Sequence, residues 1–151
     1  MRVIHMGSFD ASASTKYHGA LPGGLYEHSE DMTCDLLLLT ERLGLVWQRP
    51  RSPYLDGMLH DLCKCDLYEP QPDGTFLFRE NLPLTGHGEK FVILVQQFLD
   101  LTEEEVLCIR WHMGAYDNSQ YWSSIGTAIE KYPNVLYTHM ADMIAYRING
   151  V

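Results

Sequence analysis

The stretch LHDLCK (residues 59–64) lies in a segment with helical periodicity. This segment begins near Pro53, a residue that the first turn of a helix tolerates, and we expect it to run to about Cys65. Neighbouring residues on a helix point about 100° apart, so His60 and Asp61 can share a metal ion only if it sits between this helix and others. The adjacent His-Asp pair therefore predicts helices that converge on a metal ion.

Four further residues are candidate partners for this pair. His28 belongs to the first predicted helix and Asp142 to the last, and helices distant in sequence can meet in one core. His87 and His112 fit a second metal ion, and the two oxygens of Asp61 could bridge the pair. Imidazole and carboxylate donors with open coordination positions are typical of a site for Mn, Fe, Co, Ni, Zn or Mg, and not of a closed structural zinc site. We therefore expect one or two divalent metal ions as the cofactor.

Apolar residues at helical spacing predict an all-α fold. Gly44 is a plausible end for the first helix, and Thr102 with Glu105 forms a capping box at the start of another. The expected helices span about 25–43, 53–65, 84–99, 102–113, 121–131 and 133–148. Residues 67–80 differ, because Asp-Gly beside a Phe-Leu-Phe run predicts a small β-hairpin or a long loop. Residues 1–20 are expected to form an arm or loop of a single domain spanning 1–151.

Composition and charge exclude several classes of protein. The chain has 151 residues, 46% of them hydrophobic, which suits one globular domain, and its apolar runs are too short for a membrane span. Eleven Lys and Arg face twenty Asp and Glu, and the net charge of -9 disfavours binding to duplex nucleic acid. Small phosphorylated substrates remain compatible with this charge. The N-terminus lacks the basic start and apolar stretch typical of a signal peptide, so we expect a cytoplasmic protein whose four cysteines are reduced and mostly buried.

The candidate ligands occur in an ordered set of short motifs. The set resembles the HD-domain metal-dependent phosphohydrolase superfamily in its six-ligand form, H…HD…H…H…D, over about residues 22–146. The motifs that carry the resemblance are GGLYEH (23–28), LHDLCK (59–64), GHGEK (86–90), IRWHMG (109–114) and HMADM (139–143).

This resemblance implies a helical HD-domain bundle that holds one or two divalent metal ions. By analogy, one ion would be bound by His28, His60, Asp61 and Asp142. The other would be bound by Asp61, His87 and His112. Every ligand position of the pattern is occupied, which argues against an inactive descendant.

The activity implied is hydrolysis of a phosphate ester in a nucleotide or another small phosphorylated metabolite, by a metal-activated water. Asp61 and Lys64 are the candidate catalytic residues. The same ligand pattern also serves mixed-valent di-iron oxygenases and single-stranded nucleic acid nucleases, and a non-catalytic nucleotide-binding module is a further alternative. The acidic charge argues against the nuclease. The sequence leaves the oligomeric state open.

Several other residues are candidates for contacts with the substrate. Lys64 follows His60 by four residues and could neutralise a substrate phosphate next to the metals. Lys90, three residues after His87, could face the same cavity or the solvent. Tyr116 could stack on a base, although core packing explains it equally well. The last candidate, His139, could hydrogen-bond a metal ligand or belong to the core.

Overall fold

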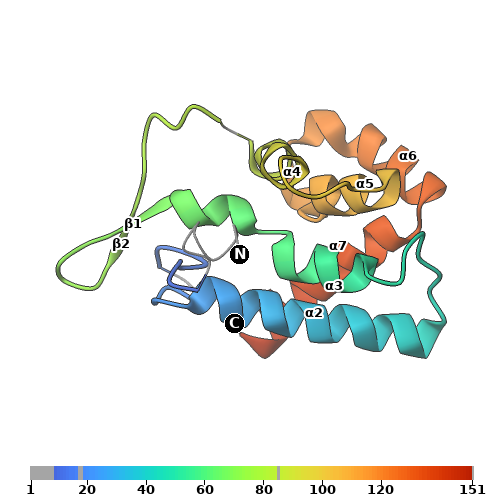
Figure 1. Cartoon of the computed structure of the whole chain (residues 1–151), viewed down its shortest axis with the longest axis horizontal. Coiled ribbons are helices and arrows are strands. Elements are labelled where there is room, and N and C mark those ends of the chain that lie inside the picture. Colours follow the sequence, from blue (N-terminus) through green and yellow to red (C-terminus); the bar gives the residue numbers. More distant parts are fainter. Residues whose placement is uncertain (1–8, 17–18, 85, 151) are drawn as a thin grey trace.

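A computed structural model describes residues 9–16, 19–84 and 86–150. The described chain is mostly helical and carries a small two-stranded antiparallel sheet (Figure 1). Its α-helices are α2 (Gly24–Leu43), α3 (Ser52–Leu59), α4 (His87–Gln96), α5 (Glu103–Trp111), α6 (Trp122–Lys131) and α7 (Asn134–Ile144). The strands are β1 (Tyr68–Pro70) and β2 (Phe76–Phe78). The shorter helical turns are η1 (Leu62–Asp66), η2 (Gly114–Tyr116), η3 (Ser119–Tyr121) and η4 (Ala145–Asn149). The predicted all-α architecture with one β excursion is confirmed at this level.

The first long helix, α2, forms one side of the molecule (Figure 1). Its buried face includes Leu25, Met32 and Leu36, at the spacing of an amphipathic helix. It ends at Gly44, whose φ of 64° is the left-handed conformation that glycine adopts without strain. The Gly44 N–H donates to the carbonyl of Thr40 and closes the last turn. The predicted boundaries of this helix are therefore confirmed.

The helix that carries the His-Asp pair is shorter than the sequence predicts. α3 ends at Leu59, and His60 is its C-cap. Asp61 has φ −107° and ψ 13°, which interrupts the α-helix before η1 continues as a 3₁₀ turn from Leu62. The expectation of one helix from Pro53 to about Cys65 is therefore wrong beyond Leu59. This break changes the angle between the two adjacent side chains, so both reach one centre.

The segment 67–80 forms the hairpin that the sequence left as one of two options. β1 and β2 pair antiparallel, with Tyr68 opposite Phe78. The carboxylate of Asp73 accepts hydrogen bonds from the backbone N–H and the hydroxyl of Thr75 and closes the turn. The hairpin projects away from the helices (Figure 1).

The described part of the N-terminal arm, residues 9–16 and 19–20, is a loop without helix or strand. Ser12 is buried there, and its hydroxyl donates to the carbonyl of Gly19. Residues 1–8 and 17–18 of the predicted arm lie outside the described residues.

The remaining helices follow the predicted pattern, with different ends. α5 begins at the capping box, in which the Thr102 hydroxyl accepts from the Glu105 N–H and the Glu105 carboxylate accepts from the Thr102 N–H. α4 begins only at His87, three residues later than predicted. α7 ends at Ile144, and the chain continues in the wider π turn η4 instead of a regular helix.

Packing of α2 against α3 and α7, and of α5 against α4 and α7, forms the core. A buried cluster under α2 consists of Met32, Leu36, Ala141 and Ala145. A second lies between α3, η1, α4 and α5, and includes Leu55, Leu62, Phe91, Val95 and Ile109. In the described part of the chain, no helix combines the length and hydropathy that a membrane span requires.

Gly57 sets the close approach of α3 to α2. A Cβ added at Gly57 would lie 2.4 Å from Oγ1 and 2.7 Å from Cα of Thr33 on α2, so Gly57→Ala forces the two helices apart. Overpacking of this kind costs about 1–3 kcal/mol of the free energy of unfolding. Gly126→Ala on α6, where a Cβ would meet nothing within 4 Å, serves as the control. We expect it to stabilise by about 0.5–1 kcal/mol. Urea unfolding measures both; equal effects of the two variants would contradict this packing.

Asp56 is a buried carboxyl group on α3. It has no exposed surface, and among the described residues its carboxyl oxygens contact no nitrogen or oxygen at hydrogen-bond distance, only the thiol of Cys108. Burial raises the pKa of Asp56 well above its usual range, and the nearby Glu105 carboxylate raises it further. Native Asp56 therefore keeps its proton at pH values where the unfolded chain has lost it.

Asp56→Asn should remove this pH dependence. Between the usual carboxyl pKa and the raised native one, the native state binds more protons, so wild-type stability falls as pH rises, by at most about 1.4 kcal/mol per pH unit. Asparagine does not titrate and loses no stability in this way. The free energy of unfolding of the variant minus that of the wild type should therefore increase with pH. Urea unfolding in chelator from acid to neutral pH measures it; a pH-independent difference would contradict a protonated Asp56.

Candidate metal centre

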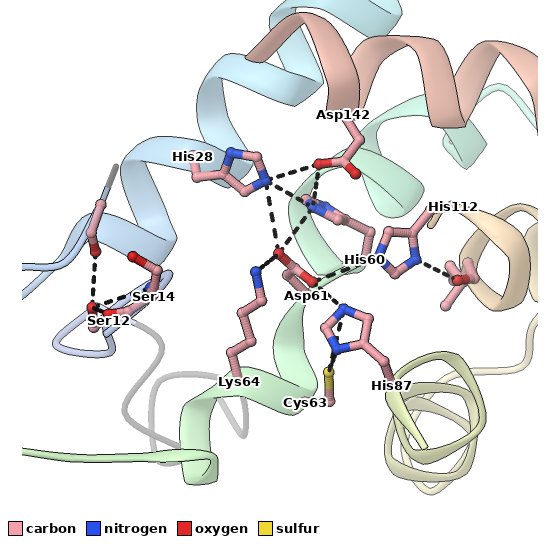
Figure 2. A network of polar contacts seen from close by, with 12 residues as sticks. Ser12, Ser14, His28, His60, Asp61, Cys63, Lys64, His87, His112 and Asp142 are labelled. Carbon is pink, nitrogen blue, oxygen red and sulfur yellow. Dashed lines mark hydrogen bonds and ion pairs between the residues drawn. The ribbon is translucent and has the colours of Figure 1, made fainter. Parts of the chain in front are cut away.

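The structure brings all six predicted ligands to one place. They come from separate elements, α2, the end of α3, α4, the end of α5 and α7, and their side chains point toward one another around Asp61 (Figure 2). His28, His60, Asp61 and His112 are at most 3% exposed, and His87 and Asp142 are partly exposed. The members of this cluster are His28, His60, Asp61, His87, His112 and Asp142.

One half of the cluster faces Oδ2 of Asp61. Nε2 of His28 lies 3.7 Å and Nε2 of His60 3.4 Å from this oxygen. The two imidazole nitrogens are 3.2 Å apart, and Oδ1 of Asp142 lies 3.1 Å from His28. Three nitrogen and oxygen donors from three elements therefore surround this side of the Asp61 carboxylate, a donor set that divalent metal ions favour.

The other half faces Oδ1 of Asp61. Nε2 of His87 lies 2.6 Å from this oxygen, and Nε2 of His112 lies 3.5 Å from it. The two oxygens of one carboxylate thus point to different histidine pairs. The possible donor groups overlap: His60 belongs to one group with His28 and Asp142 and to another with Asp61 and His112. The division of the ligands between two ions therefore stays a prediction.

Backbone carbonyls orient two of the imidazoles. Nδ1 of His60 donates to the carbonyl of Gly57 at 2.8 Å, and Nδ1 of His112 donates to that of Ile109 at 2.7 Å. A neutral imidazole with its proton on Nδ1 presents the lone pair of Nε2, and both Nε2 atoms point into the cluster. These contacts hold the rings in the tautomer that binds metal.

The protein atoms alone leave His112 unsatisfied. Its Nε2 is buried, and Oδ1 of Asp61, 3.5 Å away, is too distant for a good hydrogen bond. A buried polar atom without a partner costs about 1–3 kcal/mol, and a cation beside Asp61 would remove that cost. The donor chemistry and this orphaned nitrogen therefore fit a bound divalent ion.

His87 is oriented by a sulfur atom, a contact that sequence reasoning missed. His87 is the first residue of α4, and its Nδ1 lies 3.3 Å from Sγ of Cys63. Asp61, Cys63 and His87 together form a third group of possible metal donors. The signal in the sequence was the position of Cys63 two residues after Asp61. The expectation that the cysteines are mostly buried holds for Cys63 and Cys108, whereas Cys65 is partly buried and Cys34 is exposed.

Cys63 contacts one nitrogen of His87 and Asp61 contacts the other, as in a cysteine nucleophile with its histidine base and an orienting carboxylate. The electrostatics oppose that role, because burial and the charge of Asp61 raise the pKa of the Cys63 thiol. Cys63 therefore stays protonated.

The two carboxylates of the cluster are ionised. Burial alone would raise the pKa of Asp61, but Lys64, His60 and His87 outweigh it and hold this pKa well below its usual range. Burial would also raise the pKa of Asp142, but the hydrogen bond with His28 outweighs it and lowers this pKa to about 2. The centre thus presents anionic oxygens to a cation.

The two predicted lysines lie in different surroundings. Nζ of Lys64 is 2.5 Å from Oδ2 of Asp61, on the open side of the cluster. Lys90 is buried, so it does not face the solvent, and it lines a separate cavity with His87 and Cys63, not the one that Lys64 lines. It forms an ion pair with Asp66. Lys64 is therefore the cation beside the centre.

His139 and Tyr116 surround the predicted ligands. Nδ1 of His139 donates to the backbone carbonyl of His112 at 2.6 Å, so it supports a ligand-bearing residue through its main chain. Tyr116 is 59% exposed and lines the cavity above the centre.

Two cavities flank the centre. The first, of about 240 Å³, has His28, Asp61, Lys64 and Asp142 on its floor. Its other walls are Met113, Tyr116, Met143, Tyr146 and Arg147. The second, of about 300 Å³, lies on the far side of His87 and is lined mostly by apolar side chains of the hairpin and the segment before α4. The centre is thus open to a small molecule from the first cavity.

Comparisons of the chain with protein-family models, curated proteins and solved structures found no match. The assignment of the metal centre therefore depends on its geometry and donor chemistry.

Metal content of single variants tests the sharing of Asp61. Because its two oxygens face different histidines, Asp61→Ala should lower bound Mn²⁺ to background, whereas His87→Ala should lose only the ion on its own side. Asp73→Ala, which removes an exposed carboxylate in the hairpin turn, is the matched control. Elemental analysis after equilibrium dialysis gives the stoichiometry. Equal metal content in wild type and Asp61→Ala would rule out the shared ligand.

Proposed function

We propose that the protein is a metal-dependent phosphohydrolase of the HD-domain superfamily, which cleaves a phosphate ester of a nucleotide or another small phosphorylated metabolite. One observation carries the proposal. The carboxylate of Asp61 lies between two sets of metal donors at the floor of an open cavity, with the ammonium group of Lys64 beside it. The ordered ligand motifs support the same family.

Two divalent ions held on either side of Asp61 would activate a water molecule and offset the charge of a bound phosphate. The residues of the chain then have separate roles. His60 and His112, oriented through Nδ1, would present their Nε2 atoms to the ions. Asp142 is ionised and can accept a hydrogen bond from the attacking water.

Lys64 completes the site. The carboxylate of Asp61 raises the pKa of Lys64, although burial opposes this, so the ammonium group stays charged at neutral pH. It lines the open cavity and can pair with an oxygen of the phosphate as negative charge develops in the transition state. A nuclease or a nucleotide-binding module would place this cation on a phosphate as well, but the net charge of -9 disfavours the nuclease. A di-iron oxygenase shares the metal ligands, and the cation beside them favours phosphate hydrolysis over it.

The test is a phosphate-release assay on nucleotides, sugar phosphates and a chromogenic diester, with Mn²⁺ or Co²⁺. We expect turnover that chelator abolishes and that Asp61→Ala lacks, while Asp73→Ala retains it. Absence of turnover in protein that binds iron and consumes oxygen would contradict hydrolysis and identify the oxygenase. Absence of both activities, with or without bound metal, would also refute the proposal.

Lys64→Met separates catalysis from metal binding. The variant keeps all six ligands, so its metal content should match the wild type. Loss of one preorganised charge at the reacting group should lower kcat about 10²-fold or more. Steady-state kinetics and elemental analysis on the same preparation measure both quantities. An unchanged kcat would show that Lys64 takes no part in the reaction.

A further inference from the structure

The wall of the first cavity contains an arginine that the proposed chemistry does not use. Arg147 lies in the π turn η4, five residues after Asp142. The side chain of Asn149 ties this turn to α2, with Nδ2 2.6 Å from Asp31 and 3.0 Å from Asp35. Single π turns in α-helices occur often at functional sites. The turn therefore places Arg147 on an anchored part of the cavity rim.

Two tyrosines hold the guanidinium group. Its central carbon lies 4.8 Å from the ring centroid of Tyr146 and 5.8 Å from that of Tyr116. One guanidinium nitrogen also lies 3.4 Å from the hydroxyl of Tyr116. Aromatic contacts of this kind use the faces of a guanidinium and leave N–H groups at its edge for a carboxylate or phosphate.

Arg147 also differs from the other cations near the centre. Lys64 is paired with Asp61, Lys90 with Asp66, and Arg110 with Asp117. No carboxylate in residues 9–16, 19–84 and 86–150 forms an ion pair with Arg147. In a chain with a net charge of -9, a cation at a cavity mouth without a carboxylate partner is suited to attract an anion.

The wall between Arg147 and the metal ligands is apolar. Met113, Met143 and the ring of Tyr146 line it, and the described residues that line the cavity include no Ser, Thr, Asn or Gln. Such a surface offers few hydrogen bonds to sugar hydroxyls and packs well against a hydrocarbon or planar group. The cavity thus combines an anion site at its floor, an apolar middle and a second cation at its rim.

We propose that Arg147 binds a second anionic group of the substrate, so that the substrate class is a phosphate ester whose apolar or planar body carries a further carboxylate or phosphate. This inference rests on the proposed function for the role of the phosphate at the floor. Arg147 acts as a specificity residue and takes no part in bond cleavage.

A matched set of probes tests the inference. Alkyl phosphates with spacers of increasing length are compared with the same molecules carrying a terminal carboxylate or a terminal phosphate. Binding to the Mn²⁺-loaded full chain is measured by calorimetry, and phosphate release is measured in parallel. We expect one spacer length at which the second anion tightens binding about tenfold, as one charge-assisted contact provides. The carboxylate and phosphate series show which anion Arg147 prefers.

Arg147→Met should abolish that gain and leave the affinity for plain alkyl phosphates unchanged, which also shows that the variant is folded. Arg42→Met, in the last turn of α2 and outside the cavity, should keep the gain. A gain that persists in Arg147→Met, or no gain at any spacer length, overturns the inference. An Arg147-dependent gain without phosphate release would instead refute the proposed hydrolysis and keep the second anion site.

Discussion

The carboxylate of Asp61 is shared between two groups of imidazoles, and five helical elements meet around it. Its Oδ2 faces His28 and His60, and its Oδ1 faces His87 and His112. A carboxylate buried at this depth is costly unless opposite charge surrounds it. The ammonium group of Lys64 offsets part of this cost, and a metal ion bound by the surrounding donors would offset the rest. The core packing of α2, α3, α5 and α7 brings these donors together.

The break after α3 is what makes this arrangement possible. A continuous α-helix would direct adjacent side chains about 100° apart. Because Asp61 leaves the α conformation, its carboxylate lies 3.4 Å from Nε2 of His60. The close contact of Gly57 with Thr33 then brings the same helix against α2, which carries His28. The backbone at Gly57 and at Asp61 thus determines how the ligands are arranged.

The sequence predicted the helices, because their apolar periodicity is strong. It also predicted the members of the cluster, because few residue types other than His and Asp can serve as these ligands. It did not predict the break at Asp61, since Leu59 and Leu62 on either side favour helix. The contact of Cys63 with His87 was also missed, because it joins elements 24 residues apart. Arg147 gave no sequence signal, since a π turn depends on packing against α2 and its side chain lies outside the ligand motifs.

Electron paramagnetic resonance during a Mn²⁺ titration addresses the shared carboxylate directly. If the two oxygens of Asp61 bridge two ions, a second equivalent of Mn²⁺ should replace the hyperfine pattern of an isolated ion with the broad signal of an exchange-coupled pair. In Asp61→Asn the coupled signal should not form. Two equivalents that bind with independent, uncoupled signals would contradict a bridging Asp61, and with it the dinuclear centre on which the proposed chemistry depends.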